Sequence, residues 1–420
     1  MARSERTIRH AELAKGWFKR IAPFAWLPVL LVSLASCEWF CLPTEIATMP
    51  TVDAQVDRNA QGIVAPRSTV KSTEEPVVML PNHTRSIRGA YWFNAEVASI
   101  PARYYTHVYH AFLRSDNNGN LLLNAASTPT ASFAQTAAKF VAHVHKGGAY
   151  AMLSLGGGMD KSFHVFTPNA VKRRRYVNAV LAVVQKYGYD GVDLDWEHPR
   201  NATEKRHWAA LMTDMRTGLD MLARRSDKKY WLTAAVGTSK WNAGYFDIPT
   251  IRTKLDFINL MAYDYIGPWG GDPAGDQAAL ATASYGGHST YKALKHWHDL
   301  GIKADQIVIG LPFYTRACFG YKPGQIIQKN ASSGKRTMAF GYDSFVAYAA
   351  QKRWTYRLDP ASKVRWYRSP GGSHFAAVDG PEAIAHKTHF AESNGYRGVF
   401  CWATYHNPGQ QLQKAMAREQ

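Results

Sequence analysis

Short apolar runs alternate with amphipathic stretches along the chain from residue 88 onward. This alternation is typical of repeated strand–helix units built around a parallel sheet. Eight of the apolar runs have the length and the flanking turn residues of buried strands. The predicted strands cover residues 89–94, 106–113, 150–154, 189–195, 230–237, 255–263, 306–312 and 397–403.

Helices are expected between most of these strands. The clearest one covers residues 169–186, where apolar positions recur at helical spacing and basic residues fall on the opposite, solvated side. The other predicted helices cover residues 131–145, 203–223 and 290–300. Eight strands within about 320 residues favour an α/β fold of the (β/α)8 TIM barrel type over an open doubly wound sheet.

One stretch interrupts the alternation. Between residues 318 and 381 the pattern predicts one helix, at residues 342–351, and three short strands, at residues 355–357, 364–367 and 373–378. We interpret this stretch as a small α+β insertion between the seventh strand and the last helix. It is expected to form one wall of a cleft.

The first 37 residues have the pattern of an export signal. Basic residues are frequent up to Arg20, an apolar run covers residues 21–36, and small residues precede Cys37. This pattern is typical of a secretory signal peptide, and its Leu-Ala-Ser-Cys ending resembles a bacterial lipobox. Cys37 would then be a lipidated first residue that attaches the protein to a membrane; an uncleaved signal anchor is the alternative.

Residues 38–85 are rich in Thr, Pro and small residues and show little periodicity, which predicts a flexible tether. The folded domain is therefore predicted to cover residues 86–420. We expect the protein to be exported, either secreted or held at the membrane as a lipoprotein.

Composition changes this picture little. The chain of 420 residues is 46% hydrophobic and 20% charged, which is typical of a globular protein. Its formal net charge of +18 favours anionic partners such as wall polymers, or it reflects a basic surface without a specific partner. The sequence shows no nucleic-acid-binding motif, so no nucleic-acid partner is expected. We expect a monomer.

The four cysteines do not form a disulfide framework. Cys318 and Cys401 would meet if the last two barrel strands were neighbours. Otherwise they are two small buried apolar residues.

The strongest chemical signal is an alternation of acids and apolar residues in the fourth strand. Because side chains alternate faces along a strand, Asp193, Asp195 and Glu197 are expected to share one face, with Val192 and Leu194 on the other. Glu197 would lie at the C-terminal end of the strand, where active sites of barrel enzymes lie. Two such charges about 5 Å apart repel by roughly 3 kcal/mol at an effective dielectric constant of about 20. At least one acid should therefore keep a proton near neutral pH, as a general acid must.

A metal site is the alternative interpretation of three neighbouring acids. A calcium loop would need a turn with a glycine and closely spaced Asp or Asn residues, whereas the apolar residues between these acids favour a strand. The sequence shows no cluster of His or Cys ligands. We therefore predict no metal and no other cofactor.

The segment 190–197 resembles the DxxDxDxE signature of glycoside hydrolase family 18, the chitinase family. Further segments resemble family motifs in the same order along the chain, and together they extend over about residues 86–415. These are residues 154–157 (SxGG), 261–265 (MxYD) and 311–316, together with Tyr91, Phe112 and Trp402.

The resemblance implies a retaining, substrate-assisted reaction. Glu197 would protonate the glycosidic oxygen, and the 2-acetamido oxygen of the substrate would attack the anomeric carbon. Asp195 would bind the acetamido N–H, Asp193 would share a proton with Asp195, and Tyr263 would orient the acetamido oxygen. The resemblance also implies substrate-binding residues: Asp264 and Arg316 for sugar hydroxyls, Tyr91, Phe112 and Trp402 for an apolar floor, and Gly157 and Met261 from the matched motifs.

The implied substrate is chitin or chito-oligosaccharide, cut by an endo-type enzyme. Many family members carry a Trp where this chain has Gly158, which weakens one subsite beyond the cut. The alternatives are an endo-β-N-acetylglucosaminidase, a peptidoglycan-directed hydrolase of the same family, and a non-catalytic chitinase-like lectin. Such lectins usually lack the acid that is present here as Glu197.

Overall fold

The computed structural model describes residues 86–418, apart from residues 227, 282–284, 286, 330 and 332–333. The predicted export signal and the predicted tether, including Cys37, lie outside the described residues. Within the described part of the chain, no helix is both long enough and apolar enough to cross a membrane.

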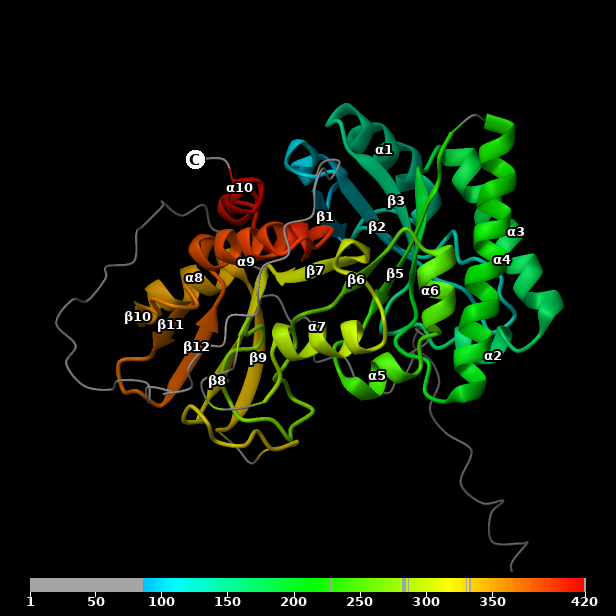
Figure 1. The fold of residues 1–420 in the computed structure, drawn as a ribbon. Coiled ribbons are helices and arrows are strands. Elements are labelled where there is room, and N and C mark those ends of the chain that lie inside the picture. The colour runs from blue at the N-terminus through cyan, green and yellow to red at the C-terminus, as the bar shows by residue number, and fades with distance from the viewer. Residues whose placement is uncertain are drawn as a thin grey trace, which may run out of the picture. The chain divides into compact units, whose positions relative to one another are not determined.

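Eight parallel strands close into a barrel in the order β1-β13-β7-β6-β5-β4-β3-β2 (Figure 1). Each of the eight predicted strands is present, with ends that differ from the prediction by a few residues. The strands are β1 (Ile87–Trp92), β2 (His107–Leu113), β3 (Tyr150–Gly156), β4 (Gly191–Asp195), β5 (Trp231–Val236), β6 (Phe257–Leu260), β7 (Ile307–Pro312) and β13 (Gly398–Trp402). The predicted TIM barrel is confirmed.

Helices surround the barrel, and α3 and α4 lie side by side on its outside (Figure 1). The four predicted helices are present as α1 (Phe133–Lys146), α3 (Ala170–Tyr187), α4 (Ala202–Ser226) and α7 (Thr290–Asp299). A further long helix, α9 (Pro381–Ser393), precedes β13. The shorter helical segments of the barrel domain are α2 (Phe163–Phe166), α5 (Lys240–Gly244), α6 (Ile248–Lys254), α10 (Gln411–Ala417), η1 (Val97–Ser99), η2 (Ala102–Tyr104), η3 (Ala304–Gln306) and η4 (Thr404–His406).

Helix α3 shows why the sequence specifies these elements. Asn169 caps its first turn, because the side-chain oxygen accepts hydrogen bonds from the backbone N–H groups of Val171 and Lys172. Gly188 ends it in the left-handed conformation (φ 82°), which glycine adopts without steric cost. The apolar positions that recur at helical spacing are buried in the main core between helices and barrel, as the periodicity predicts: Val177, Val180, Leu181 and Val184.

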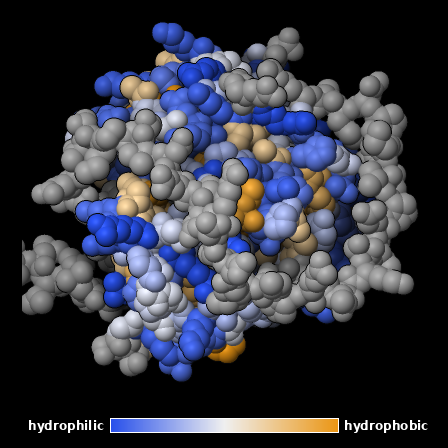
Figure 2. Space-filling model, turned by 90° about the vertical axis from the view of Figure 1, so that its left-hand side faces the viewer, coloured by the Kyte–Doolittle hydropathy of each residue, from blue (hydrophilic) through white to orange (hydrophobic). Residues whose placement is uncertain are grey.

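The insertion is a five-stranded antiparallel sheet in the order β10-β11-β12-β8-β9, packed against helix α8 (Tyr342–Gln351). Its strands are β8 (Tyr314–Phe319), β9 (Arg336–Gly341), β10 (Thr355–Leu358), β11 (Arg365–Arg368) and β12 (His374–Val378). Figure 2 views the molecule from the side on which Figure 1 places β10 and α8, and hydrophilic and apolar residues mix on its coloured surface. Exposed residues from the end of α8 to the end of β10 include Lys352, Arg353 and Leu358.

The predicted start of the insertion at residue 318 is wrong, because the insertion begins with β8 at Tyr314. The apolar run continues from β7 into β8, so the sequence shows no break between them. The break occurs at Phe313, whose backbone N–H donates to the carbonyl of Trp402 while the next residues enter the second sheet. Strand β9 is missing from the prediction, because none of its six residues is fully buried and its pattern is correspondingly weak.

The two cysteines in the described part of the chain are buried and unpaired. Cys318 lies on β8 in the insertion sheet, whereas Cys401 lies on β13 in the barrel, with its sulfur 3.8 Å from the hydroxyl oxygen of Tyr105. The disulfide alternative is therefore wrong, since the two residues belong to different sheets.

Candidate active site

The acids of β4 follow the alternation that the sequence predicts. Asp193 and Asp195 are 0% and 3% exposed, while Val192 and Leu194 belong to the core between barrel and helices. Glu197 lies two residues beyond the end of β4, and 31% of its side chain is exposed. The acids therefore form a column that leads from the barrel interior to solvent at the C-terminal end of the strand.

Asp193 is held by four neighbouring side chains. Its Oδ2 atom accepts hydrogen bonds from the hydroxyl groups of Tyr91 and Ser154, both at 2.8 Å. Its Oδ1 atom accepts from the hydroxyl of Thr233 at 2.6 Å and from the amide of Asn259 at 3.2 Å. Burial raises the pKa of Asp193, and these four hydrogen bonds oppose that effect because they favour the ionised form.

The position of Asp195 between two other acids favours its protonated form. Burial, followed by the charges of Glu197 and Asp193, raises its pKa well above the usual range. Its Oδ1 atom is buried and has no hydrogen-bond partner among the described residues. A proton at this position reduces the repulsion within the column.

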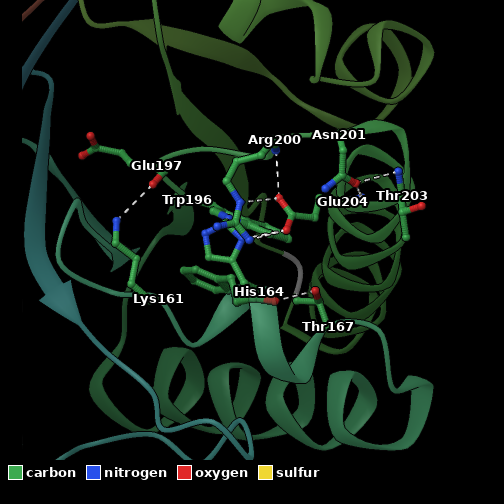
Figure 3. Close-up of polar contacts among 10 residues, drawn as sticks. Lys161, His164, Thr167, Trp196, Glu197, Arg200, Asn201, Thr203 and Glu204 are labelled. Carbon is green, nitrogen blue, oxygen red and sulfur yellow. Dashed lines mark hydrogen bonds and ion pairs between the residues drawn. The ribbon is translucent and has the colours of Figure 1, made fainter.

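Glu197 has the acid–base properties of a group that titrates near neutral pH. Burial raises its pKa to about 7; the ammonium group of Lys161 opposes this effect and the charge of Asp264 adds to it. The Nζ atom of Lys161 donates to the backbone carbonyl of Gly158 at 2.7 Å. It also donates to the backbone carbonyl of Glu197 at 3.4 Å (Figure 3). Burial lowers the pKa of the adjacent His198 to about 4, so this imidazole is neutral at pH 7.

The segment after β6 contributes a tyrosine and an acid. Burial, together with the charges of Asp195 and Asp264, raises the pKa of Tyr263, so its hydroxyl keeps its proton and can donate it in a hydrogen bond. Asp264 has a left-handed backbone (φ 60°), and its carboxylate accepts from the hydroxyl of Tyr314 at 2.5 Å. It also accepts from Nε and Nη2 of Arg316, at 2.7 and 2.9 Å.

Two of the predicted substrate-binding residues are almost fully buried. Arg316 is only 4% exposed, and its guanidinium forms an ion pair with Asp264. Tyr91 is 2% exposed and binds Asp193 with its hydroxyl, so it supports the acid column from below. Sequence patterns identify the strand and the face of such residues but not their depth along the barrel axis.

Aromatic rings surround the open end of the barrel. Trp402 stacks on Phe112 with ring centroids 5.7 Å apart and on Phe93 with centroids 6.2 Å apart. Phe112, Phe93 and Trp402 are each partly exposed, and Met261 packs against the same cluster. Phe93 is absent from the sequence prediction, although its alternation with Tyr91 in the first strand was a usable signal.

The glycines after β3 allow close approach of other groups. Gly157 has φ 87°, and its N–H donates to the carbonyl of Asp195 at 2.9 Å. A β-carbon at Gly157 would lie 2.7 Å from the ring of Phe112. A β-carbon at Gly158 would lie 3.2 Å from Oε1 of Glu197, so the missing side chain leaves space directly beside this carboxyl.

We expect Gly157→Ala to destabilise the fold by at least about 1–2 kcal/mol, because a β-carbon strains the left-handed backbone and also meets Phe112. Chemical denaturation measures the loss. Gly371→Ala is the matched control, since its β-carbon would meet open space and its φ is not positive. Equal stability of the two variants would contradict the prediction.

Thr233 and Asn259 were also not predicted, and Lys161 was not considered. Thr233 and Asn259 are polar residues within the otherwise apolar runs of β5 and β6, and each bonds to Asp193. That exception to the apolar pattern was the available signal. Lys161 lies in a loop, where the sequence offers no periodic pattern.

Comparison with known proteins identifies relatives of this chain. The sequence profile of the glycosyl hydrolases family 18 matches residues 87–407. The class V chitinase of Arabidopsis thaliana is 27% identical over 334 residues, which cover 75% of this chain and 85% of that protein. Chitinase A1 of Niallia circulans is also 27% identical, over 60% of this chain and 40% of its own length.

Solved structures have the same fold. The class V chitinase from Nicotiana tobaccum has a TM-score of 0.69 at 22% identity, and the match covers 80% of this chain and 99% of that one. The chitinase-like agglutinin from Robinia pseudoacacia has a TM-score of 0.67 at 22% identity, with the same coverage. Because an enzyme and an agglutinin match equally well, the fold alone does not decide between catalysis and sugar binding.

Proposed function

The chain belongs to the family 18 glycosyl hydrolases, and from this premise we propose that it is an endo-type chitinase. Its substrates are β-1,4-linked N-acetylglucosamine polymers or oligomers, which it cleaves with retention of configuration. One observation carries the proposal. The partly exposed Glu197 ends a column of three acids, and its pKa is raised to about 7. Such a carboxyl is suited to give a proton and to take it back near neutral pH.

In the first step, Glu197 transfers its proton to the glycosidic oxygen as the bond from that oxygen to the anomeric carbon breaks. The carbonyl oxygen of the 2-acetamido group forms the new bond to the anomeric carbon, which gives a cyclic oxazolinium ion. In the second step, water attacks this carbon, the bond from the acetamido oxygen to the carbon breaks and restores the 2-acetamido group, and Glu197 accepts a proton from the attacking water. Two displacements at one carbon retain its configuration.

Asp195 and Tyr263 are suited to hold the acetamido group. The carboxyl of Asp195 accepts the acetamido N–H, and the hydroxyl of Tyr263 donates to the acetamido oxygen and fixes its line of attack. The raised pKa of Tyr263 supports its role as a donor, because its hydroxyl keeps its proton. Supporting the role of Asp195, its Oδ1 atom is buried and has no hydrogen-bond partner among the described residues, so it is available to accept. Orientation of a neighbouring nucleophile in this way is a large source of rate enhancement.

The remaining side chains are suited to bind the sugar ring. Asp264, which Arg316 and Tyr314 hold in place, accepts hydrogen bonds from sugar hydroxyls. Trp402 and Phe112 offer partly exposed aromatic faces to the apolar face of a pyranose. The similarity of this chain to the fold of an agglutinin does not favour a lectin. Glu197 is present, and its pKa is raised as a general acid requires.

Product analysis tests the proposal. Chitohexaose, cellohexaose and peptidoglycan are incubated side by side, and products are identified by mass spectrometry. We expect chitohexaose to yield internal cleavage products with the β-anomer in excess at early times. Absence of cleavage would contradict the proposed activity, and preferential cleavage of peptidoglycan would assign the enzyme to the alternative substrate.

We also propose that residues 1–37 direct export and that residues 38–85 tether the catalytic domain of residues 86–420. The basic start, the apolar run and the Cys37 motif of the sequence support this proposal. An exported enzyme would meet polymeric substrate outside the cell.

We expect Lys161→Met to move the alkaline limb of the kcat/KM profile to higher pH. Glu197 must be protonated to act as an acid, so activity falls as pH rises through its pKa of about 7. The Lys161 cation lowers this pKa, and its removal therefore raises it. Lys186→Met, on the outer helix α3, is the control. An alkaline limb unchanged in Lys161→Met would refute the electrostatic assignment.

A further inference from the structure

The segment that carries Glu197 is fixed by contacts on both sides of that residue. On one side lies Trp196, which is fully buried and stacks on Phe163 with ring centroids 5.5 Å apart. Its indole Nε1–H donates to Nε2 of His164 in α2 at 3.4 Å (Figure 3). The residue directly before the proposed acid is thus anchored to a histidine outside the barrel.

The indole contact determines the protonation of His164. An indole N–H can only donate, so Nε2 of His164 is an acceptor and carries no hydrogen. Burial lowers the pKa of His164, which favours the neutral ring. The single ring proton therefore lies on Nδ1, and this atom is 3.1 Å from Oε1 of Glu204, in a contact too bent for a well-aligned hydrogen bond.

The carboxylate of Glu204 also holds the other side of the segment. It accepts from the backbone N–H of Arg200 at 2.8 Å and from Nη2 of Arg200 at 2.6 Å (Figure 3). Asn201 caps the first turn of α4 by accepting from the N–H groups of Thr203 and Glu204. A negative charge in the first turn is favourable for a helix.

Glu204 is charged at neutral pH. Its burial tends to raise the pKa, but the side-chain and backbone hydrogen bonds from Arg200, together with the Arg200 charge, prevail and lower it to about 2. One ionised carboxylate therefore contacts, directly or through His164, the residues on both sides of Glu197.

We propose that His164 and Glu204 are positioning residues that hold the Glu197 segment in its active geometry. Neither residue is assigned a contact with substrate; both act through Trp196 and Arg200. The inference rests on the proposed function of Glu197 as the acid. Because a displacement of about 1 Å at a reacting group can cost about 10²-fold in rate, a rigid support of this kind has a direct effect on catalysis.

Two substitutions of His164 separate its two contacts. His164→Asn keeps a donor near the Nδ1 position but removes the acceptor for Trp196, whereas His164→Gln offers an acceptor near the Nε2 position. We expect His164→Asn to lower kcat on chitohexaose about tenfold with KM within about twofold, and His164→Gln to restore most of kcat. Trp196→Phe removes the same hydrogen bond, so the double variant with His164→Asn should be no slower than the slower single variant.

A structural control distinguishes positioning from loss of stability. Asp214→Asn weakens the ion pair with Arg173, whose guanidinium also donates to the carbonyl of Thr167 just after α2. We expect this variant to unfold at lower temperature with an unchanged kcat per folded molecule. If His164→Asn also loses only stability, or if His164→Gln is as slow as His164→Asn, the positioning proposal is wrong.

Crystal structures of the wild type and His164→Asn provide a readout that does not need activity. We expect the Glu197 carboxyl to move by at least about 0.5 Å in the variant, the tolerance of a catalytic geometry. An unmoved Glu197 would refute positioning even if the enzyme is an active chitinase. A displaced Glu197 in a protein that cleaves no chitin would uphold positioning and refute the proposed function.

Discussion

Glu197→Gln is expected to lower kcat for chitohexaose by about 10³-fold, within the range that a general acid contributes. Glutamine keeps the size of the side chain but has no proton to give to the leaving oxygen. Affinity for the oligosaccharide should remain close to that of the wild type, because Glu197 contributes proton transfer and little binding. Stopped assays for kcat and calorimetric titration with chitohexaose measure the two quantities.

Glu392→Gln is the matched control for this change, since it makes the same substitution at a glutamate that pairs with Arg418 near the end of the described chain. We expect this control to keep the wild-type kcat. A Glu197→Gln variant with more than about a tenth of the wild-type kcat would assign the proton transfer to another group. Asp195 would then be the first candidate, because its pKa is also raised.

Much of the fold could be predicted because burial and pattern agree in the barrel strands. Most barrel strands are apolar runs between turn signals, the fourth alternates acids with apolar residues, and all eight were identified. Strand β9 and the short helix α2 escaped prediction for a different reason. Strand β9 has no fully buried residue, and α2 has only four residues, too few to show a helical period.

The acid column was predictable because it lies within one strand, whereas the residues that bind Asp193 from other strands were not. Asp193, Asp195 and Glu197 lie at alternate positions of one strand, so a single local pattern places them together. Thr233 and Asn259 approach Asp193 from β5 and β6, and their proximity depends on how the barrel strands are staggered. The stagger is a property of the closed sheet, and a sequence pattern does not contain it.

The contact between Glu204 and His164 could also not be predicted from the sequence, although the position of Glu204 in a helix could. Glu204 lies in the first turn of a predicted helix, where an acid is expected from the helix dipole alone. Only the structure shows that its carboxylate also reaches a histidine on α2 and the backbone of Arg200. The helix dipole alone would explain the position of Glu204. In the structure, Glu204 also contacts residues that hold the segment of the proposed acid.

Cellohexaose is expected to be cleaved at least about 10⁴-fold more slowly than chitohexaose in kcat/KM. The two hexamers share the β-1,4-linked pyranose backbone, but cellohexaose has a hydroxyl in place of the 2-acetamido group. It therefore lacks the internal nucleophile, and a well-oriented internal nucleophile is equivalent to about 10⁵ M or more of an external one. Initial rates of reducing-end release on both hexamers measure the ratio.

Within the described acid column, Asp195 is poorly suited to replace the missing nucleophile. In a retaining enzyme with two carboxylates, the second one must be ionised to attack the anomeric carbon. Asp195 is the next acid to Glu197 in the column, and burial and its two acidic neighbours raise its pKa, which favours the protonated form. A protonated carboxyl is a poor nucleophile, although its carbonyl oxygen can still accept the acetamido N–H. Rapid cleavage of cellohexaose, or a covalent glycosyl adduct on Asp195 in mass spectrometry, would show that the acid column works by the two-carboxylate route instead.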